Sequence, residues 1–295
     1  MRILISGANG FLGHYLTGLL LRRGHDVVAT GAGPCRLPGY PGTGFVYEEM
    51  DFTDEPELSR VFNRYRPEFV IHAGARSKPD DCELDRKKAF DCNVNGTRYL
   101  LAAAASSRAY FLFLSTDFIF DGRQGMYRED AVPGPVNYYG VTKLLAEEWV
   151  RNYPYDWGIA RTVLVYGKPP AGRSNLLTLV SDKLRRGEIF RVVNDQFRTP
   201  TYIDDLAGGL ASMIEKKATG IYHLSGTDWL TPYEMAFKTA EYLRLDSSLL
   251  VKVTAADFPE PALRPLKTGF NIEKARRELG YDPVSFETGL RHTFS

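Results

Sequence analysis

Residues 3–13 read Ile-Leu-Ile-Ser-Gly-Ala-Asn-Gly-Phe-Leu-Gly, and this stretch decides the expected fold. An apolar run typical of a buried strand leads into a glycine-rich turn and then into the apolar spacing of a helix. Gly7 allows a tight turn, Gly10 lets a pyrophosphate approach the backbone, and Gly13 lets the helix pack closely on the strand. The helix N-terminus adds N–H donors and a partial positive charge. A structural glycine turn can also explain the spacing, but its position after the first strand predicts a dinucleotide site.

Short apolar runs alternate with helical patterns through the first half of the chain, as buried parallel strands joined by crossover helices do. The expected strands cover residues 3–6, 26–30, 45–50, 69–73, 110–115 and 158–165. The expected helices cover residues 11–23, 55–65, 82–106, where a break is open, and 138–153. The alternation predicts an α/β protein with a doubly wound parallel Rossmann sheet.

The pattern loosens after Gly167, where a Pro- and Gly-containing loop over residues 168–172 opens a segment of shorter helices and strands. We therefore predict an NAD(P)-binding Rossmann domain over residues 1–167 and a smaller C-terminal α/β lobe, mainly substrate-binding, over residues 168–295. Segments such as residues 202–215 are candidates to return to the first domain.

Composition and charge exclude several classes of protein. The 295 residues include 37 basic and 36 acidic side chains, for a net charge of +1. This balance argues against a broad attraction to nucleic acid or to a membrane surface, although a local basic pocket for a phosphorylated ligand stays open. No apolar run approaches the roughly 18 residues of a membrane span. Met1-Arg2 leads directly into the first strand, so we expect no secretory signal.

Cysteine and histidine usage point to a cytoplasmic protein without a metal. The three cysteines, Cys35, Cys82 and Cys92, are odd in number and show no CxxC spacing, which favours a reducing compartment. The five histidines are scattered along the chain without the spacing of metal ligands, so no metal site is expected.

The end of the second expected strand indicates which dinucleotide binds. It reads Val-Ala-Thr-Gly over residues 28–31, and Arg36 follows after a short loop. NAD-binding domains usually carry an acidic residue there, which bonds the adenosine ribose and would repel a 2′-phosphate. Its absence favours NADPH, with Thr30 and Arg36 as contacts. NADH, with Arg36 in solvent, is the alternative.

Two further stretches follow expected strands. Asp51-Phe52 follows the third strand and is expected beside the adenine. Ala73-Gly74-Ala75 follows the fourth, where small residues let a cofactor cross the sheet edge. Tight helix packing is the alternative explanation for these three small residues.

Tyr139 and Lys143 stand four residues apart in an expected helix, so a phenol and an ammonium share one face. A free tyrosine has a pKa of about 10, and a nearby cation stabilises the phenolate and lowers that pKa. Ser115-Thr116 ends the fifth expected strand and can place a hydroxyl against a carbonyl that is being reduced. A YxxxK spacing alone is usually a surface pair. Together with the glycine loop and the hydroxyl, it becomes a candidate catalytic constellation.

Seven motifs carry a resemblance to a known family. They are GANGFLG (7–13), STDFIFDG (115–122), YREDAVPGPVNYYGVTK (127–143), RTVLVYG (161–167), DQFRTPTYIDDLA (195–207), GIYHLSG (220–226) and ALRP (262–265). These motifs cover nearly the whole chain in the family's order. The chain resembles an extended short-chain dehydrogenase/reductase and is most similar to the dTDP-4-dehydrorhamnose reductase family.

The resemblance implies a reaction and roles for the matching residues. Tyr139 would donate the proton, Lys143 would lower the Tyr139 pKa and bind the nicotinamide ribose, and Thr116 would polarise the substrate carbonyl. A hydride would pass from NADPH to the 4-keto group of a nucleoside-diphosphate deoxysugar, converting dTDP-4-dehydrorhamnose to dTDP-rhamnose. The cofactor-binding residues expected from both arguments are Gly7, Asn9, Gly10, Phe11, Leu12, Gly13, Thr30, Arg36, Asp51, Phe52, Ala73, Gly74, Ala75, Tyr139 and Lys143.

Three residues depart from the family's pattern where the sugar is expected. Phe118 replaces a tyrosine, Leu164 a tryptophan and Arg198 a glycine, so the identity of the sugar is the open question. Phe118 also breaks the Thr-Asp-Glu triplet with which dehydratases of the superfamily eliminate water, so dehydration is disfavoured. The expected substrate-binding residues are Thr116, Asp117, Phe118, Leu164, Asn175, Arg198 and Arg264, the last three for the diphosphate of a nucleotide-sugar.

Two other functions stay open on the sequence alone. The β subunit of methionine adenosyltransferase resembles the same family, so a non-catalytic NADP-binding regulatory subunit is one alternative. A reductase or epimerase of a different sugar nucleotide is the other. The resemblance also implies a homodimer formed through long helices. The presence of Thr116, Tyr139 and Lys143 favours the enzyme.

Overall fold

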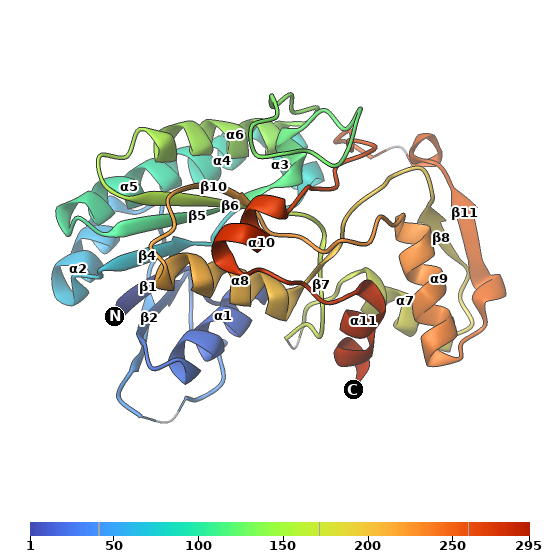
Figure 1. Cartoon of the computed structure of the whole chain (residues 1–295), viewed down its shortest axis with the longest axis horizontal. Coiled ribbons are helices and arrows are strands. Elements are labelled where there is room, and N and C mark those ends of the chain that lie inside the picture. Colours follow the sequence, from blue (N-terminus) through green and yellow to red (C-terminus); the bar gives the residue numbers. More distant parts are fainter. Residues whose placement is uncertain (41, 171, 259) are drawn as a thin grey trace.

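A seven-stranded parallel sheet forms the centre of the protein in the computed structural model, which describes residues 1–40, 42–170, 172–258 and 260–295 (Figure 1). The strands lie in the order β10-β6-β5-β4-β1-β2-β3, and each neighbouring pair is parallel. They are β1 (Arg2–Ser6), β2 (Asp26–Gly31), β3 (Phe45–Glu49), β4 (Phe69–His72), β5 (Tyr110–Thr116), β6 (Trp157–Thr162) and β10 (Gly220–His223). The predicted doubly wound Rossmann sheet is confirmed.

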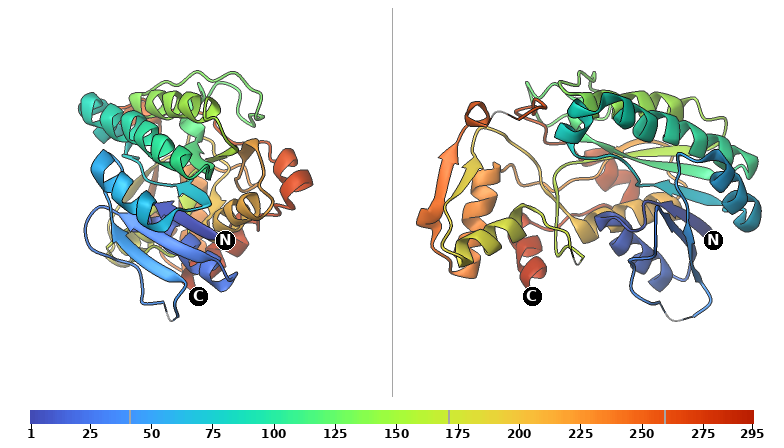
Figure 2. Two further views of the ribbon diagram at one scale, coloured as in Figure 1. Left: turned by 90° about the vertical axis from the view of Figure 1, so that its left-hand side faces the viewer. Right: turned by 180° about the vertical axis from the view of Figure 1, so that it is seen from behind.

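Helices cover both faces of this sheet, as the left view of Figure 2 shows. Alternate residues of a strand point to opposite faces. Ile3 and Ile5 of β1 therefore join the core shared with α1 and α8, whereas Leu4 joins the core shared with α2, α5 and α6. The helices are α1 (Phe11–Arg22), α8 (Ile203–Glu215), α2 (Glu55–Tyr65), α5 (Gly96–Ser106) and α6 (Tyr138–Arg151).

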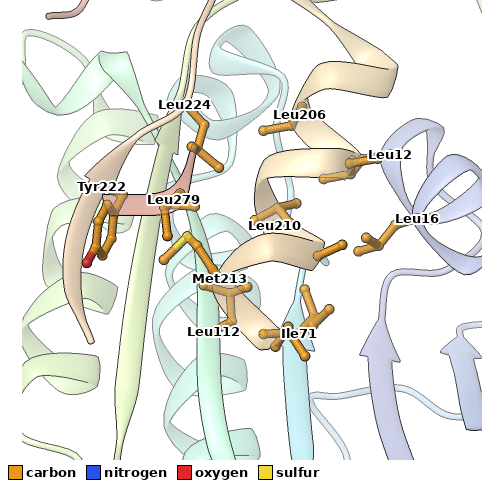
Figure 3. Packing of buried hydrophobic residues seen from close by; sticks show 14 of the residues in the cluster. Leu12, Leu16, Ile71, Leu112, Leu206, Leu210, Met213, Tyr222, Leu224 and Leu279 are labelled. Atoms are coloured by element: carbon orange, nitrogen blue, oxygen red, sulfur yellow. The ribbon is translucent and has the colours of Figure 1, made fainter. Parts of the chain in front are cut away.

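The helix α8 belongs to the core of the large sheet although it comes late in the sequence. It packs against α1. Figure 3 shows its Leu206, Leu210 and Met213 facing the same buried cluster as Ile71 of β4 and Leu112 of β5. All five side chains are buried. The strand β10 belongs to this sheet, and the helix α10 (Glu273–Leu279) packs against β10. Segments before and after residue 167 therefore both contribute to the large sheet and its helices. The division into domains at residue 167 stays a prediction.

A smaller α/β lobe lies at one end of the molecule (Figure 1; Figure 2, right view). Its helices α7 and α9 pack on a two-stranded parallel sheet of β8 and β11 and enclose a separate apolar core. The short strands β7 and β9 pair between the two parts. The elements are α7 (Leu176–Arg185), β8 (Phe190–Val193), α9 (Pro232–Leu243), β11 (Leu250–Val253), α11 (Phe286–Phe294), β7 (Val165–Tyr166) and β9 (Thr201–Tyr202).

Two predicted elements differ in the structure. The expected helix over residues 82–106 is broken into α3 (Pro79–Leu84), α4 (Arg86–Phe90), a π-helical turn and α5. The break occurs because the Asp85 side chain accepts a hydrogen bond from the Lys88 N–H and so starts α4 as an N-cap. The strand expected to run to residue 165 ends at Thr162, and Leu164 just beyond it has φ +29°. Residue 171 of the predicted loop lies outside the described residues.

Within the described ranges, no helix combines the length and apolarity needed to cross a bilayer. Among the same residues, no group of three or more histidine, cysteine, aspartate or glutamate side chains could hold a metal ion. The three cysteines are free, and only Cys35 is exposed.

We predict that Leu210→Ala lowers the free energy of unfolding by about 2–5 kcal/mol, because the side chain is fully buried between α8 and the large sheet. The matched control is Leu179→Ala on α7, where the side chain is 39% exposed and the expected loss is below about 0.5 kcal/mol. Urea unfolding measures both. Equal losses would contradict this placement of α8.

Candidate active site

The glycine-rich loop between β1 and α1 packs directly against the end of β4. Gly7 has φ +82°, and a Cβ on it would lie 2.7 Å from the Cα of Gly74. The N–H groups of Gly7 and Ala8 both donate to the carbonyl of Thr30, at 3.0 and 2.9 Å, which ties the loop to β2. A Cβ on Gly13 would lie 2.5 Å from the Cα of Ala8. The backbone thus has the tight turn and close helix packing that the spacing predicts.

The helix α1 begins directly after the glycine-rich loop. Gly10 is its N-cap, and no side chain of the described residues caps this helix end. The first N–H groups of the helix are therefore left to a ligand or solvent. Phe11 lines the cleft beside the helix end, whereas Leu12 packs in the apolar core below it (Figure 3).

A basic cleft of about 1080 Å³ opens beside the helix end. Asn9 links its walls, because its Oδ1 accepts from the Arg36 backbone N–H at 2.9 Å and its carbonyl accepts from Arg173 Nη2 at 3.2 Å. Lys78 and Arg173 line the cleft with Arg36, and the sequence analysis missed both. No local pattern connects the loop after β4 with residues 172–174. The lining residues are Asn9, Phe11, His14, Arg36, Leu37, Pro38, Lys78, Pro170, Gly172, Arg173 and Ser174.

Two predicted cofactor residues use their polar groups within the protein. Thr30 is buried, and its hydroxyl donates to the Ile5 carbonyl at 3.0 Å. Thr30 contributes its carbonyl to the glycine-rich loop, and a contact of Thr30 with the cofactor stays a prediction. Asp51 is exposed, and its Oδ1 accepts from the N–H and hydroxyl of Thr53, at 2.9 and 2.7 Å. A contact between Asp51 and the adenine stays a prediction.

The small residues after β4 pack against Phe52. A Cβ on Gly74 would lie 2.7 Å from Cε1 of the Phe52 ring, which also meets His72 edge to face at a centroid distance of 5.0 Å. Ala73 and Ala75 are half-buried on either side. The tight packing considered as an alternative is present, and contact with a cofactor stays a prediction.

The helix α6 positions Tyr139 and Lys143 one turn apart. It begins behind Asn137, whose Oδ1 accepts from the Gly140 N–H at 2.9 Å and whose Nδ2 donates to the Leu263 carbonyl at 2.7 Å. Lys143 is buried; its Nζ donates to the carbonyl of Leu114 on β5 at 2.7 Å and lies 3.9 Å from the centroid of the Phe113 ring. Tyr139 is half-buried, and its ring meets Phe118 edge to face at 5.9 Å.

Burial sets the charge states of this pair. It lowers the pKa of Lys143 to about 7, against the opposing charge of Glu147. It raises the pKa of Tyr139, and a hydrogen bond with Thr116 only partly offsets this rise. Desolvation of the phenolate is the largest cause of this rise, and a lowering of the Tyr139 pKa by Lys143 stays a prediction. Tyr139 therefore holds its proton.

Thr116 and Asp117 form a buried cluster at the end of β5. The Thr116 hydroxyl donates to Asp117 Oδ1 at 3.0 Å and accepts from the Phe118 N–H at 3.2 Å. Asp117 also accepts from the Thr268 hydroxyl and lies 3.8 Å from Nε of Arg198. Burial raises the pKa of Asp117 while Arg198 opposes the rise. Asp117 thus joins β5 to the C-terminal part of the chain.

The two arginines expected at the diphosphate, Arg198 and Arg264, have partners within the protein. Both terminal nitrogens of buried Arg198 donate to the protein, including the carbonyls of Leu266 at 3.0 Å and Pro265 at 2.7 Å. Arg264 makes a bidentate pair with Asp80, at 2.6 and 2.7 Å. These contacts brace the loop over residues 262–266, so a diphosphate role would require an exchange of partners.

Asn175 and Leu164 complete the predicted substrate set. Asn175 is the N-cap of α7: its Oδ1 accepts from the backbone of Leu177 and Thr178, and its Nδ2 donates to the Gly167 carbonyl at 2.6 Å. Capping therefore accounts for its position at the helix start. Leu164 is 39% exposed at φ +29°, free to contact a ligand.

We predict that Gly7→Ala lowers the free energy of unfolding by about 3 kcal/mol or more, since positive-φ strain and the clash with Gly74 add. Gly24→Ala is the matched control: Gly24 has φ +77° with open space around it, so only the strain of about 1–2 kcal/mol remains. Chemical unfolding compares the two. A loss for Gly7→Ala no larger than the control would contradict the close contact.

The chain is similar along its whole length to a known protein family and to curated members of it. The profile of the RmlD substrate binding domain family matches residues 1–295. The dTDP-4-dehydrorhamnose reductase of Aggregatibacter actinomycetemcomitans is 28% identical over 99% of this chain and 97% of its own length. Methionine adenosyltransferase 2 subunit beta of Xenopus laevis is 29% identical over 99% and 86%.

A solved structure shows the same likeness in three dimensions. The crystal structure of dTDP-4-dehydrorhamnose reductase from Bacillus anthracis in complex with NADP superimposes with a TM-score of 0.87, at 28% identity over 99% of this chain and 98% of that one. The family match spans all of the chain and the fold agrees with it. This protein therefore belongs to the RmlD substrate binding domain family, among the extended short-chain dehydrogenases/reductases.

Proposed function

We propose that this protein reduces the 4-keto group of a nucleoside-diphosphate deoxysugar with NADPH, converting dTDP-4-dehydrorhamnose to dTDP-rhamnose. The observation that carries the proposal is the placement of Tyr139 and Lys143 one turn apart on α6, beside Thr116 at the end of β5. A reduction needs a protonated donor next to a hydroxyl that can bond the carbonyl, and this arrangement supplies both.

The residues around the glycine-rich loop fit a dinucleotide with a 2′-phosphate. The uncapped start of α1 offers N–H groups for the pyrophosphate. Gly7 and Gly74 place no side chain where the loop meets the end of β4. The end of β2 carries no carboxylate, while Arg36, Lys78 and Arg173 line the adjoining cleft. The Bacillus anthracis relative, which binds NADP, supports this choice.

NADPH, when bound, supplies a hydride from C4 of its nicotinamide ring. The hydride adds to the sugar C4, and the carbonyl oxygen takes up the electron pair of its broken π bond. Tyr139 gives its phenolic proton to that oxygen, which completes a C4 hydroxyl. The Thr116 hydroxyl, which donates to Asp117 Oδ1 in the protein, turns its proton to the substrate oxygen as the charge on that oxygen grows. The Lys143 ammonium stabilises the phenolate that is left, and solvent returns the proton.

The cluster at the end of β5 supports reduction over dehydration. Elimination of water would need a free carboxyl acid–base pair, and Phe118 stands where dehydratases of the superfamily carry glutamate. Asp117 is buried and held by Thr116, Thr268 and Arg198. Exposed Leu164 and half-buried Phe118 are our proposed apolar contacts for the sugar. Contacts of Asn175, Arg198 and Arg264 with the diphosphate, a homodimer and a cytoplasmic setting stay predictions.

A regulatory, non-catalytic subunit is the second candidate, and the likeness to methionine adenosyltransferase 2 subunit beta favours it. The assay that separates the two follows NADPH absorbance with dTDP-4-dehydro-6-deoxy-L-mannose and with a panel of other 4-keto-sugar nucleotides. The reductase oxidises NADPH with one of them. Folded protein that binds NADPH and oxidises it with none contradicts the proposal and favours the regulator.

We predict that Tyr139→Phe lowers kcat by about 10²–10⁴-fold while NADPH binding is retained, because only the transferable proton is lost. Tyr138→Phe is the matched control on the same helix, since the Tyr138 ring lies under Arg86 at 5.0 Å. Initial rates and NADPH fluorescence titration measure both effects. An unchanged kcat for Tyr139→Phe would remove the proposed donor.

We predict that Arg36→Ala lowers the NADPH-over-NADH ratio of kcat/KM by about tenfold or more, since a charge-assisted bond to the 2′-phosphate is lost. Arg277→Ala on α10 is the control, because this exposed arginine pairs with Glu278 outside the cleft. A native preference for NADH, or a ratio untouched by Arg36→Ala, contradicts the assignment.

A further inference from the structure

A buried ion pair lies on α6 one turn beyond Lys143. Glu147 is fully buried, and its two carboxylate oxygens accept from Nε and Nη2 of Arg161 on β6, at 2.9 and 2.7 Å. Arg151, whose side chain is 40% exposed, adds a third bond from the outer side at 3.0 Å. Burial would raise the pKa of Glu147, but the two arginines outweigh it and hold the pKa low, so Glu147 is ionised.

The partners of Arg161 fix this carboxylate in place. Arg161 is 1% exposed, and its Nη1 donates to the Glu129 carbonyl at 3.3 Å and lies 3.4 Å from Nε2 of His223 on β10. Its guanidinium also lies 5.3 Å from the Phe120 ring centroid. The carboxylate is therefore held from β6, and it makes no ion pair with Lys143 within the described residues.

Stability alone gives a weak reason for this pair. Removing two charges from water is unfavourable, and apolar residues of the same volume often serve a core as well or better. A buried pair beside a group whose charge matters to chemistry therefore suggests a role at that group.

Lys143 has few charged neighbours. His72 on β4 is neutral, because burial, aided by Lys143 itself, lowers its pKa to about 3. Burial raises the pKa of the Cys92 thiol, and it raises the pKa of Tyr139, so both are neutral as well. Among the described residues, Glu147 is the carboxylate that counters the effect of burial on Lys143.

We propose that Glu147, anchored by Arg161, is a positioning residue that favours the protonated form of Lys143 while the Lys143 ammonium keeps its bond to the Leu114 carbonyl. The proposal rests on the reductase function insofar as Lys143 acts on Tyr139 there. The carboxylate acts through space along one helical turn. Since Arg161 and Arg151 are the bonded partners of the Glu147 carboxylate, it supplies negative charge without occupying the donors of Lys143.

The test measures the charge of Lys143 directly and needs neither cofactor nor sugar. The protein is labelled with ¹³C at lysine Cε, and the Lys143 signal, assigned with Lys143→Arg, is followed against pH. In Glu147→Gln the titration midpoint falls by about one pH unit or more. In Arg151→Met, which keeps Glu147 and its bonds to Arg161, the midpoint stays or rises. An unchanged midpoint in folded Glu147→Gln overturns the proposal.

A second variant guards against a folding defect. Glu147→Gln leaves Arg161 buried without its carboxylate, so Glu147→Gln/Arg161→Met removes both charges and keeps the volume. Its Lys143 midpoint also lies below that of the native protein. A pair that only stabilises the fold would lower Tm in both variants and leave the midpoint in place, which would overturn the proposal.

The same shift appears in turnover. In Glu147→Gln the loss of kcat at alkaline pH begins lower by the shift seen in the lysine signal, with KM for NADPH and sugar nearly unchanged at acidic pH. Failure of the native protein to reduce any sugar would contradict the proposed function and leave the lysine titration as an independent measurement of Glu147.

Discussion

The backbone contact between Gly7 and Gly74 is the constraint on which the site depends. It brings the glycine-rich loop against the end of β4 with no side chain between them. The parallel register sets the ends of neighbouring strands level, pairing Ser6 with Thr30 and with His72. Because parallel strands share one carboxyl edge, the glycine-rich loop and the Thr116 end of β5 lie at the same edge. The helix α6 places Tyr139 and Lys143 there as well.

Burial gives this edge its chemistry. An ammonium taken out of water tends to lose its proton, and a phenol taken out of water tends to keep one. Lys143 and Tyr139 show both effects: the phenol keeps its proton, as the proposed reduction requires of a donor, while the charge of the lysine depends on a nearby carboxylate. The Glu147–Arg161 pair links this dependence to β6 and β10, so in our proposal the C-terminal half of the chain contributes to the charge of Lys143 on α6.

The features that could be predicted from the sequence are those that depend on residues close together in the chain. The glycine loop, the sheet and the spacing of Tyr139 and Lys143 follow from local periodicity, and family motifs added the order of the parts. Contacts between distant segments could not be predicted: Arg198 binds carbonyls at Pro265 and Leu266, and Arg264 binds Asp80. The sequence shows where an arginine stands, but it does not show which acceptors the arginine will bond once the fold buries it. Glu147 stands four residues after Lys143, and a glutamate in a helix is expected to face solvent. Only the fold shows that its side chain is buried.

The most direct test of hydride transfer at this edge uses NADPH carrying deuterium at C4 of the nicotinamide, in each of its two stereochemical forms. The sugar product is analysed by mass spectrometry and NMR. The account predicts that one form, and not the other, delivers deuterium to C4 of the sugar as the 4-keto group disappears. Turnover with deuterium absent from that carbon for both forms would contradict it.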